Sequence, residues 1–403
     1  MPGAAANPGV ALASLRATKW AALGLGLALL GGCGASSLNP FGDAANVAPP
    51  PPAPAQPVVG GDTFGAGPVK VAAILPLTQN GQPSAVGQSL RNAAQLAVEE
   101  SGANDVTLTI QDDRSTPDGA AQAAQAAISG GAEIIVGPLY AANVRQVATA
   151  AKAANKPVIA FSTDASVASS GVYLLSFLIE GYVDRVMEYA SSKGKKTFAV
   201  MAPQTDFGNV AVNEAQLEAS RLNVLVSVVA RYAPGQAAGA STQIVGSAPP
   251  ADAVLIAEPA DSAGAAAAAL TSKGYKGQIL GTGVWTDPKA LNAASLNGAW
   301  IAAPENAGFD SFAQRYKAKF NSDPVRLATL AYDSVSLVAA LARTQGAQRF
   351  SAGILANPSG FNGADGVFRF RPEGLNDRGL AVLRIGAGGT TVLSPAPKSF
   401  AGG

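Results

Sequence analysis

The chain has 403 residues, and 28 Lys and Arg against 27 Asp and Glu give a formal net charge of +1. No basic excess is present to neutralise a phosphate backbone, so the composition does not indicate a nucleic-acid-binding protein. Histidine is absent and Cys33 is the single cysteine, which excludes Ser-His-Asp catalysis, His-ligated zinc and an intrachain disulfide. Charged residues make up only 14% of the chain, against roughly 25% in an ordinary soluble domain. This weakly charged composition favours a binding protein over an enzyme.

Residues 1–32 have the pattern of an export signal, in which Arg16 and Lys19 lead into an apolar run at 20–30. The run is too short for a membrane helix, which needs about 20 residues, but suits a signal core of about 7–15. Small residues follow and end at Cys33. This resembles a bacterial lipobox, whose cysteine becomes an acylated N-terminus, and two or more acyl chains give durable anchoring. The alternative is an ordinary secretory signal with an incidental cysteine.

Residues 33–67 have low complexity, with a proline run at 49–52 and the pair Gly60-Gly61. Such Pro/Ala/Gly-rich segments bury too little apolar area to offset the entropy of ordering. We therefore expect a disordered, partly polyproline tether that joins the anchor to a folded body beginning near Val69.

From that point short apolar runs alternate with helical patterns. The first unit has predicted strands at Val69–Leu75, Val106–Ile110, Glu133–Val136 and Pro157–Ala160, and helices at Gln88–Glu100, Ala120–Ser129 and Asn143–Ala154. The second has strands at Thr197–Met201, Val224–Ala230, Ala253–Ala257 and Gln278–Gly281, and helices at Val210–Ala219 and Gly264–Leu270. A long helix from Val325 to about Ala342 and strands at Gly366–Phe370 and Leu380–Ile385 follow. This order predicts an α/β protein with parallel sheets, in two lobes around a cleft.

Several segments then carry a family resemblance. They are AAILPLTQNGQPSAVGQSLRNAAQLAVEE, QDDRSTPDGAAQAAQAA, EIIVGPLYAANVRQVATAAKAANKPVIAFST, FDSFAQRYKAKFNSDPVRLATLAYDSVSLVAALA and FNGADGVFRFRPEG. In this order they resemble type I periplasmic solute-binding proteins of the leucine/isoleucine/valine-binding branch, over residues 69–390. The resemblance implies two hinged lobes, each a parallel sheet flanked by helices. It also implies a protein that binds an amino-acid-like ligand for an ABC permease. The sequence disfavours an enzyme, because it shows no constellation of a general base, a nucleophile or metal ligands, and we expect no cofactor or metal.

The expected domain boundaries follow from this reading. We assign residues 68–178 and 303–345 to the first lobe and residues 179–302 and 346–395 to the second. Residues 396–403 are expected to form a flexible tail.

A strand end followed by a helix start at residues 137–143 would present free backbone N–H groups and a positive helix dipole, which suits a carboxylate. The resemblance implies that an amino acid's α-carboxylate is held by this turn and by the next strand end. The matching positions are Tyr140, Ala141, Ala142, Ser162, Thr163 and Asp164. Ala141 and Ala142 stand where the family often has a hydroxyl. For Ser162 and Thr163 the alternative is simple helix capping.

For the ligand's ammonium group, the resemblance implies an acid from the second lobe, and Glu258 and Asp261 fall at that place. The alternative is a solvated loop pair. Phe207 stands where family members often carry a tyrosine against the ligand, and Val86 replaces a common aromatic residue. Trp285 follows a second-lobe strand and either lines the cleft or packs at the edge of the lobe.

Two functions remain open. One is a periplasmic, lipid-anchored substrate-binding protein of an ABC importer, which closes its lobes around an amino acid or similar solute. The other is a regulator, because GPLYAANV, ILGTGVWTDP and NGAWIAAPENAGFDSF resemble outer-membrane lipoproteins that activate penicillin-binding peptidoglycan synthases. The prevalence of solute binding in the family and Ser162, Thr163 and Glu258 favour the binder. The lipobox, the tether and the departures from the family at Ala141-Ala142, Val86 and Phe207 favour the regulator. Gly34 and Ala35 after the cysteine, without an aspartate, favour the outer membrane.

Overall fold

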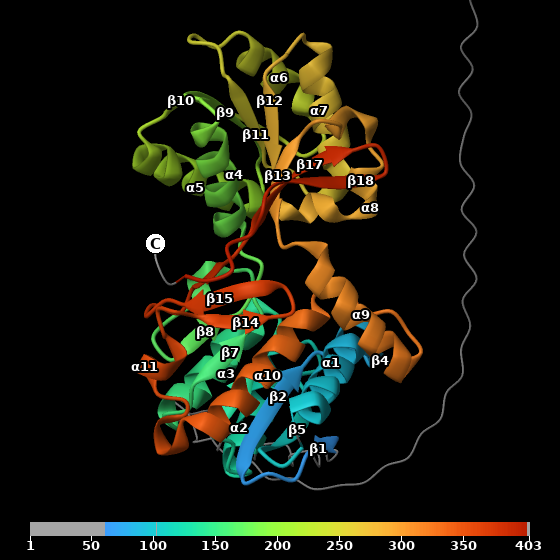
Figure 1. The fold of residues 1–403 in the computed structure, drawn as a ribbon, viewed down its shortest axis with the longest axis vertical. Helices are drawn as coiled ribbons and strands as arrows, with labels where there is room; N and C mark the ends of the chain where they lie inside the picture. Colours follow the sequence, from blue (N-terminus) through green and yellow to red (C-terminus); the bar gives the residue numbers. More distant parts are fainter. Residues whose placement is uncertain (1–60, 102, 401–403) are drawn as a thin grey trace, which may run out of the picture. The chain divides into compact units, whose positions relative to one another are not determined.

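The first of two parallel-stranded sheets is built from residues 63–174 (Figure 1). The computed structural model describes residues 61–101 and 103–400. The strand order is β1-β5-β2-β6-β7-β8, and only β1 is antiparallel to its neighbour. The strands are β1 (Thr63–Phe64), β2 (Val69–Leu75), β5 (Val106–Asp112), β6 (Ile134–Val136), β7 (Val158–Ala160) and β8 (Val172–Leu174).

Helices cover both faces of this sheet, because successive side chains of a strand point to opposite sides. In β2, Ala73 and Leu75 are buried with α1 and α10, whereas Ile74 is buried on the opposite face with α2 and α3. The sheet and its helices are the first lobe. Its helices are α1 (Ala85–Ser101), α2 (Pro117–Ser129), α3 (Ala141–Ala153), α9 (Asn306–Phe320), α10 (Ala328–Thr344) and α11 (Ala352–Leu355).

The second lobe contains a sheet of order β10-β9-β11-β12-β13-β17-β18, parallel from β10 to β13 and antiparallel beyond (Figure 1). Its faces are covered by α4 and α5 on one side and by α6, α7 and α8 on the other. The strands are β9 (Thr197–Pro203), β10 (Leu225–Tyr232), β11 (Ala253–Ile256), β12 (Gln278–Gly281), β13 (Trp300–Ala303), β17 (Ala381–Gly386) and β18 (Gly389–Ser394). The helices are α4 (Ile179–Ser192), α5 (Asp206–Leu222), α6 (Ala237–Val245), α7 (Ala260–Ser272) and α8 (Pro288–Leu291).

Short-range sequence signals set several of these boundaries. Thr116 caps α2 by accepting the Gly119 N–H at 3.0 Å, and Pro117 occupies the first turn. Thr205 caps α5 in the same way, accepting from Gly208 at 3.2 Å. A threonine hydroxyl satisfies one of the free N–H groups at a helix start, and proline lacks an N–H that would otherwise be unpaired there. The predicted two-lobed α/β architecture is confirmed.

The chain passes between the lobes three times, between β8 and α4, between β13 and α9, and between β16 and β17. Short elements complete the fold. They are the hairpin β3 (Thr78–Gln79) and β4 (Gln82–Pro83), the small sheet β14 (Phe361–Gly363), β15 (Gly366–Phe370) and β16 (Asn376–Arg378), and the 3-10 turns η1 (Ala165–Val167), η2 (Gly283–Thr286), η3 (Ala294–Leu296) and η4 (Gly346–Gln348).

The expected assignment of residues 346–395 to the second lobe needs correction. Phe368 and Phe370 of β15 are buried in the first-lobe core, and the Phe370 ring lies 5.2 Å from that of Tyr173 in β8. Only β17 and β18 join the second sheet. The alternating pattern of β15 identifies a strand, but the surface that its phenylalanines cover is formed by residues distant in the sequence.

The boundaries of the expected tether and tail also shift. The tether was expected to extend to residue 67, but Thr63–Phe64 pairs with β5, and Asp62 lies 2.6 Å from the Arg91 guanidinium. At the other end, the Ala396 N–H donates to Glu305 at 2.9 Å, and Phe400 lies under the Arg369 guanidinium. The predicted signal and Cys33 lie outside the described residues.

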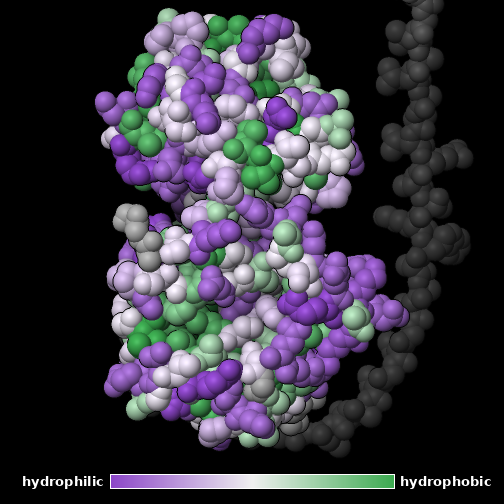
Figure 2. All heavy atoms as spheres, viewed as in Figure 1, coloured by the Kyte–Doolittle hydropathy of each residue, from purple (hydrophilic) through white to green (hydrophobic). Residues whose placement is uncertain are grey.

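The surface is polar over most of the face drawn in Figure 2, with apolar residues in small separate groups. Large apolar side chains that are exposed in the described part are scattered in the sequence: Tyr140, Leu217, Leu225, Val245 and Val392. Scattered exposure of this kind is normal for a folded domain. Within residues 61–101 and 103–400, no helix has the length and apolarity to cross a membrane.

The core assignment of β15 leads to a stability prediction. Phe368→Ala should destabilise the first lobe by about 3–5 kcal/mol, the usual cost of truncating a buried phenylalanine. Hydrogen exchange should show a larger loss of protection in β2 and β6 than in β9 and β11. Phe198→Ala, at an equally buried position of the second lobe, is the control and should give the reverse pattern. If Phe368→Ala lost protection only in β9 and β11, the assignment of β15 to the first lobe would be wrong.

Candidate functional site

A cavity of about 560 Å³ is lined by residues of both lobes and of the crossings between them. Its volume lies within the roughly 300–1,000 Å³ of small-molecule sites. Aromatic and aliphatic side chains form much of the wall, with a few polar groups among them. The apolar members include Phe177, Tyr182, Val284, Ala303, Phe309 and Leu327, and the polar members are Thr163, Thr286, Asp287, Asn306, Asp310 and Arg326.

Arg326 is the cation of this interlobe cavity. Its guanidinium forms an ion pair with the buried Asp365, donates to the Asn306 side chain at 3.3 Å, and lies 4.5 Å from the centre of the Phe309 ring. Asp365 also accepts from Thr329. A guanidinium has five N–H donors, so Arg326 retains donors that no described residue accepts. It can therefore contact an anionic group of a ligand without giving up its partner.

A second arginine lies at the crossing between β16 and β17. Arg378 donates from Nε to the Ser176 carbonyl at 3.0 Å, and its guanidinium lies 4.5 Å from the Phe177 ring centre. Its Nη1 and Nη2 atoms are buried and have no hydrogen-bond partner among the described residues. Burial lowers the pKa of Arg378, although the nearby Asp365 and Asp333 carboxylates oppose that shift. The Phe177 wall of the cavity is thus held against a buried cation.

Asp333 of α10 completes this buried charge cluster. Its Oδ1 accepts the Ala364 N–H at 2.6 Å, while Oδ2 is buried without a hydrogen-bond partner. Burial raises the pKa of Asp333 to about 7, against the opposing attraction of Arg378. Desolvation disfavours the charged form of a carboxyl group, so the group titrates near neutral pH.

A second interlobe cavity, of about 520 Å³, shares Thr163 with the first. Asp164 and Phe207 line it. Asp164 accepts the Ser166 N–H at 3.0 Å and forms an ion pair with Arg145 at 3.0 Å. The hydrogen bonds from Ser166 and the charge of Arg145 lower the pKa of Asp164, although its partial burial acts in the opposite direction. The structure therefore brings Thr163, Asp164 and Phe207 together at the interlobe cavities. Thr163 is exposed, and its hydroxyl makes no hydrogen bond to a described residue.

The other residues expected at the carboxylate lie elsewhere. Ser162 is buried and accepts the Asp164 N–H at 3.1 Å, so its hydroxyl serves the local turn, whereas the cap of η1 is the Asp164 side chain, which accepts the Ser166 N–H. Tyr140 is the N-cap residue of α3, without a side-chain capping bond, and Ala141 and Ala142 follow in the first turn. None of these residues lines either interlobe cavity. Their contact with a ligand stays a prediction.

Glu258 and Trp285 are interior residues of the second lobe. The Glu258 carboxylate accepts from Tyr232 at 2.5 Å and from Ser262 at 2.7 Å, and the Trp285 indole donates to its backbone carbonyl at 2.8 Å. Trp285 has no exposed surface. Neither Glu258 nor Trp285 lines an interlobe cavity. Asp261 is exposed in the first turn of α7. Val86 packs against the first-lobe core. Contact of Glu258 or Asp261 with a ligand's ammonium group stays a prediction, and Asp287 and Asp310 are acids that line the larger cavity.

The sequence analysis missed most of the cavity wall. Phe177 and Tyr182 follow β8 at the first crossing, and Phe309 and Arg326 follow the second crossing. Aromatic residues directly after the strands that end a lobe were the available signal. These residues line one cavity because the chain crosses between the lobes more than once, and the sequence pattern does not predict where these crossings lie in space.

A family model for periplasmic binding proteins matches residues 68–390. No curated protein matches the chain. Among solved structures, a protein from Rhodospirillum rubrum provisionally assigned to a branched-chain amino acid ABC transporter is similar with a TM-score of 0.72, 18% identity, and coverage of 81% of this chain and 99% of that one.

Two further solved structures carry ligands. A branched-chain amino acid transporter substrate-binding protein from Streptococcus pneumoniae, in complex with isoleucine, has a TM-score of 0.57 and 19% identity, covering 81% of this chain and 99% of that one. An ABC-transporter solute-binding protein from Rhodopseudomonas palustris, in complex with 3,4-dihydroxybenzoic acid, has a TM-score of 0.56 and 19% identity, covering 82% and 98%. At these identities the likeness shows the fold.

The buried carboxyl of Asp333 predicts a pH dependence of stability. Its pKa is about 7 in the folded protein and about 3.9 when unfolded, so its stabilising contribution is full below about pH 4 and is lost as the pH rises through about 7. The Asp333→Asn variant has no carboxyl group at this position, so it does not lose stability as the pH rises through this range. The unfolding free energy of the variant relative to the wild type should therefore rise between pH 4 and 8, by up to about 4 kcal/mol.

Chemical denaturation of both proteins across that range measures the difference. Burial raises the pKa of Asp184 to about 8. Asp184 is present in both proteins, so its contribution cancels in the difference between their unfolding free energies. Parallel stability curves would show that Asp333 titrates normally in the fold.

Proposed function

We propose, given that this chain belongs to the periplasmic binding protein family, that it captures a small solute between its lobes and delivers it to an ABC importer. Members of this family are solute-binding proteins, not enzymes, and they are located in the periplasm. The single observation that carries the proposal is the cavity of about 560 Å³ whose wall is shared by both lobes.

The shared wall supplies the mechanism. A ligand in such a cavity touches the first lobe through residues such as Phe309 and Arg326 and the second through residues such as Val284 and Thr286. Each lobe alone offers part of the contact, so a ligand favours the arrangement in which both parts are engaged. Movement at the crossings between rigid lobes is the usual way in which such binding proteins respond. The importer would then recognise the ligand-bound arrangement.

The lining favours a solute with an apolar body and one carboxylate. Phe177, Tyr182 and Phe309 offer apolar surface, and burial of apolar area contributes roughly 25 cal/mol per Å². Arg326 offers a cation with free donors, which suits a carboxylate. Amino acids with apolar side chains meet this description, with Asp287 or Asp310 facing the ammonium group, and so do small aromatic acids.

A block at the cavity mouth tests the proposal. Thr163 is exposed and lines both interlobe cavities, so Thr163→Trp should fill them without disturbing a core. Titration calorimetry with leucine, isoleucine, benzoate and 3,4-dihydroxybenzoate should find a ligand for the wild type. The variant should bind it at least about tenfold more weakly, a loss of about 1.4 kcal/mol.

Thr242→Trp, at an exposed threonine of α6, is the matched control and should bind as the wild type does. Equal binding by wild type and Thr163→Trp would remove the interlobe cavity as the site. The absence of heat with any of the four solutes would remove the proposed ligand class.

The lipid anchor is the second part of the proposal. Cys33 follows an apolar segment that resembles a lipobox, and acylation there would hold the protein at the periplasmic face of a membrane, the outer one by the residues that follow. The expected tether would join this anchor to the folded body. The alternative as an activator of a peptidoglycan synthase gains no support from the comparisons, which are to solute-binding proteins.

Metabolic labelling tests the anchor. Cells that produce the wild-type chain with labelled palmitate should yield labelled protein in the membrane fraction, because two or more acyl chains give stable anchoring. Cys33→Ser should carry no label, whereas Ser36→Ala, at a nearby small residue, should be labelled normally. Wild-type protein without label would contradict the lipobox, and so would label on Cys33→Ser.

A further inference from the structure

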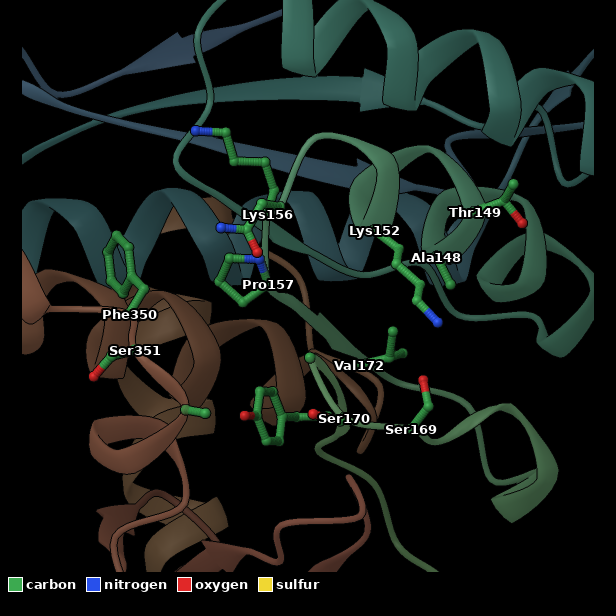
Figure 3. Close-up of a pocket in the computed structure, with 14 residues that line it drawn as sticks. Ala148, Thr149, Lys152, Lys156, Pro157, Ser169, Ser170, Val172, Phe350 and Ser351 are labelled. Carbon is green, nitrogen blue, oxygen red and sulfur yellow. The ribbon is translucent and has the colours of Figure 1, made fainter.

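A separate cavity of about 600 Å³ lies in the first lobe, between the end of α3, the turn before β8 and the segment before α11 (Figure 3). It shares no lining residue with the two interlobe cavities. All of its wall belongs to the first lobe, so its shape does not depend on movement at the crossings. Its volume is that of a site for one small organic molecule.

The charge of this first-lobe cavity is positive. Lys152, in the last turn of α3, and Lys156 line it, and no aspartate or glutamate does. Neither ammonium group has an ion pair or hydrogen bond to a described residue. Figure 3 shows Lys152 pointing toward Ser169, whereas Lys156 points away from both. Lys152 is therefore the one cation directed at the contents of the cavity.

A tyrosine hydroxyl that opens on the cavity and has no protein partner is the second, independent observation. Tyr173 in β8 is 1% exposed and lines the cavity, and its hydroxyl makes no hydrogen bond to any described residue. Its ring is fixed against Phe370 at 5.2 Å between centres. Tyr173 thus holds a donor and acceptor in place for a group that enters the cavity.

The turn that carries Ser169 is also held in place. Ser169 and Val172 exchange two backbone hydrogen bonds, at 2.8 and 3.2 Å, and the Val158 N–H donates to Gly171 at 2.9 Å. Ser169 and Asn155 are exposed and line the cavity, and the Ser169 hydroxyl and the side-chain amide of Asn155 have no hydrogen bond to a described residue. Hydroxyl and amide groups both donate and accept. They therefore match a ligand that carries several hydroxyls.

We propose that this cavity is a binding site for a saccharide unit that carries one acidic group. The acid would lie at Lys152, and the ring hydroxyls would bond to Ser169, Asn155 and Tyr173. Phe350 and Pro157 form an apolar part of the wall (Figure 3), which suits the C–H face of a sugar ring. One directed cation matches one acidic group, and the uncommitted polar groups match the hydroxyls. The site is independent of the solute proposed for the interlobe cavities.

The experiment uses the full chain and three defined probes. Titration calorimetry with glucuronate, glucose 6-phosphate and glucose separates a carboxylate, a phosphate and a neutral sugar. One of the two acidic sugars should bind and glucose should bind at least about tenfold more weakly, because a charge-assisted hydrogen bond is lost. Binding of neither acidic sugar would overturn the proposal, as would equal binding of glucose.

Three variants locate the site. Lys152→Gln should weaken binding by about tenfold or more, since it removes the contacting charge. Lys156→Gln removes the same charge from a side chain that points away, and should weaken binding less than about threefold through long-range attraction alone. Tyr173→Phe keeps the ring in the core and removes only the hydroxyl, so it should weaken binding by about three- to tenfold.

Equal losses in Lys152→Gln and Lys156→Gln would indicate diffuse electrostatic attraction and overturn the site, as would an unchanged affinity in Tyr173→Phe. Thr163→Trp, which blocks the interlobe cavities, should leave acidic-sugar binding unchanged. A loss in that variant would place the sugar between the lobes instead. This control keeps a failure here distinguishable from a failure of the proposed solute-binding function.

Discussion

Compensation of buried charge at the crossings is the constraint on which the interlobe cavity depends. Arg326 pairs with Asp365, and Arg378 lies in the field of Asp365 and Asp333 while bonding to the Ser176 carbonyl. A buried ion that loses its partner costs about 3–5 kcal/mol. These groups come from segments before and after different crossings. Their mutual compensation therefore joins parts of the chain that lie far apart in the sequence.

The same arginines shape the cavity wall. Arg378 lies 4.5 Å from the Phe177 ring centre and Arg326 lies 4.5 Å from that of Phe309, and both rings line the cavity. A guanidinium over an aromatic face is attracted by the ring's quadrupole. The apolar surface offered to a solute is thus held in position by charges behind and beside it. The carboxyl of Asp333, which titrates near neutral pH, makes this arrangement sensitive to proton concentration.

The two kinds of cavity differ in what they require of the molecule. The interlobe cavities have walls from both lobes, so their ligand must couple to movement at the crossings. The first-lobe cavity has its polar groups on β8, on the turn before it and at the end of α3, all within one lobe. A ligand there would bind without lobe movement. The two proposed sites share no lining residue, so a substitution in one can be made without altering the wall of the other.

Local spacing in the sequence was sufficient for most strands of the two sheets, for six of the helices and for the two-lobed α/β class, because backbone periodicity and caps such as Thr116 act over a few residues. It missed β8, α4, β13 and α9, which flank the first two crossings between the lobes. It also placed Thr163, Asp164 and Phe207 at strand ends or helix starts that meet at the interlobe cavities. Tertiary structure alone decided that Glu258 bonds to Tyr232, that Trp285 is core, and that β15 covers the first lobe. Burial and hydrogen-bond partners depend on residues distant in the chain, which no local pattern specifies.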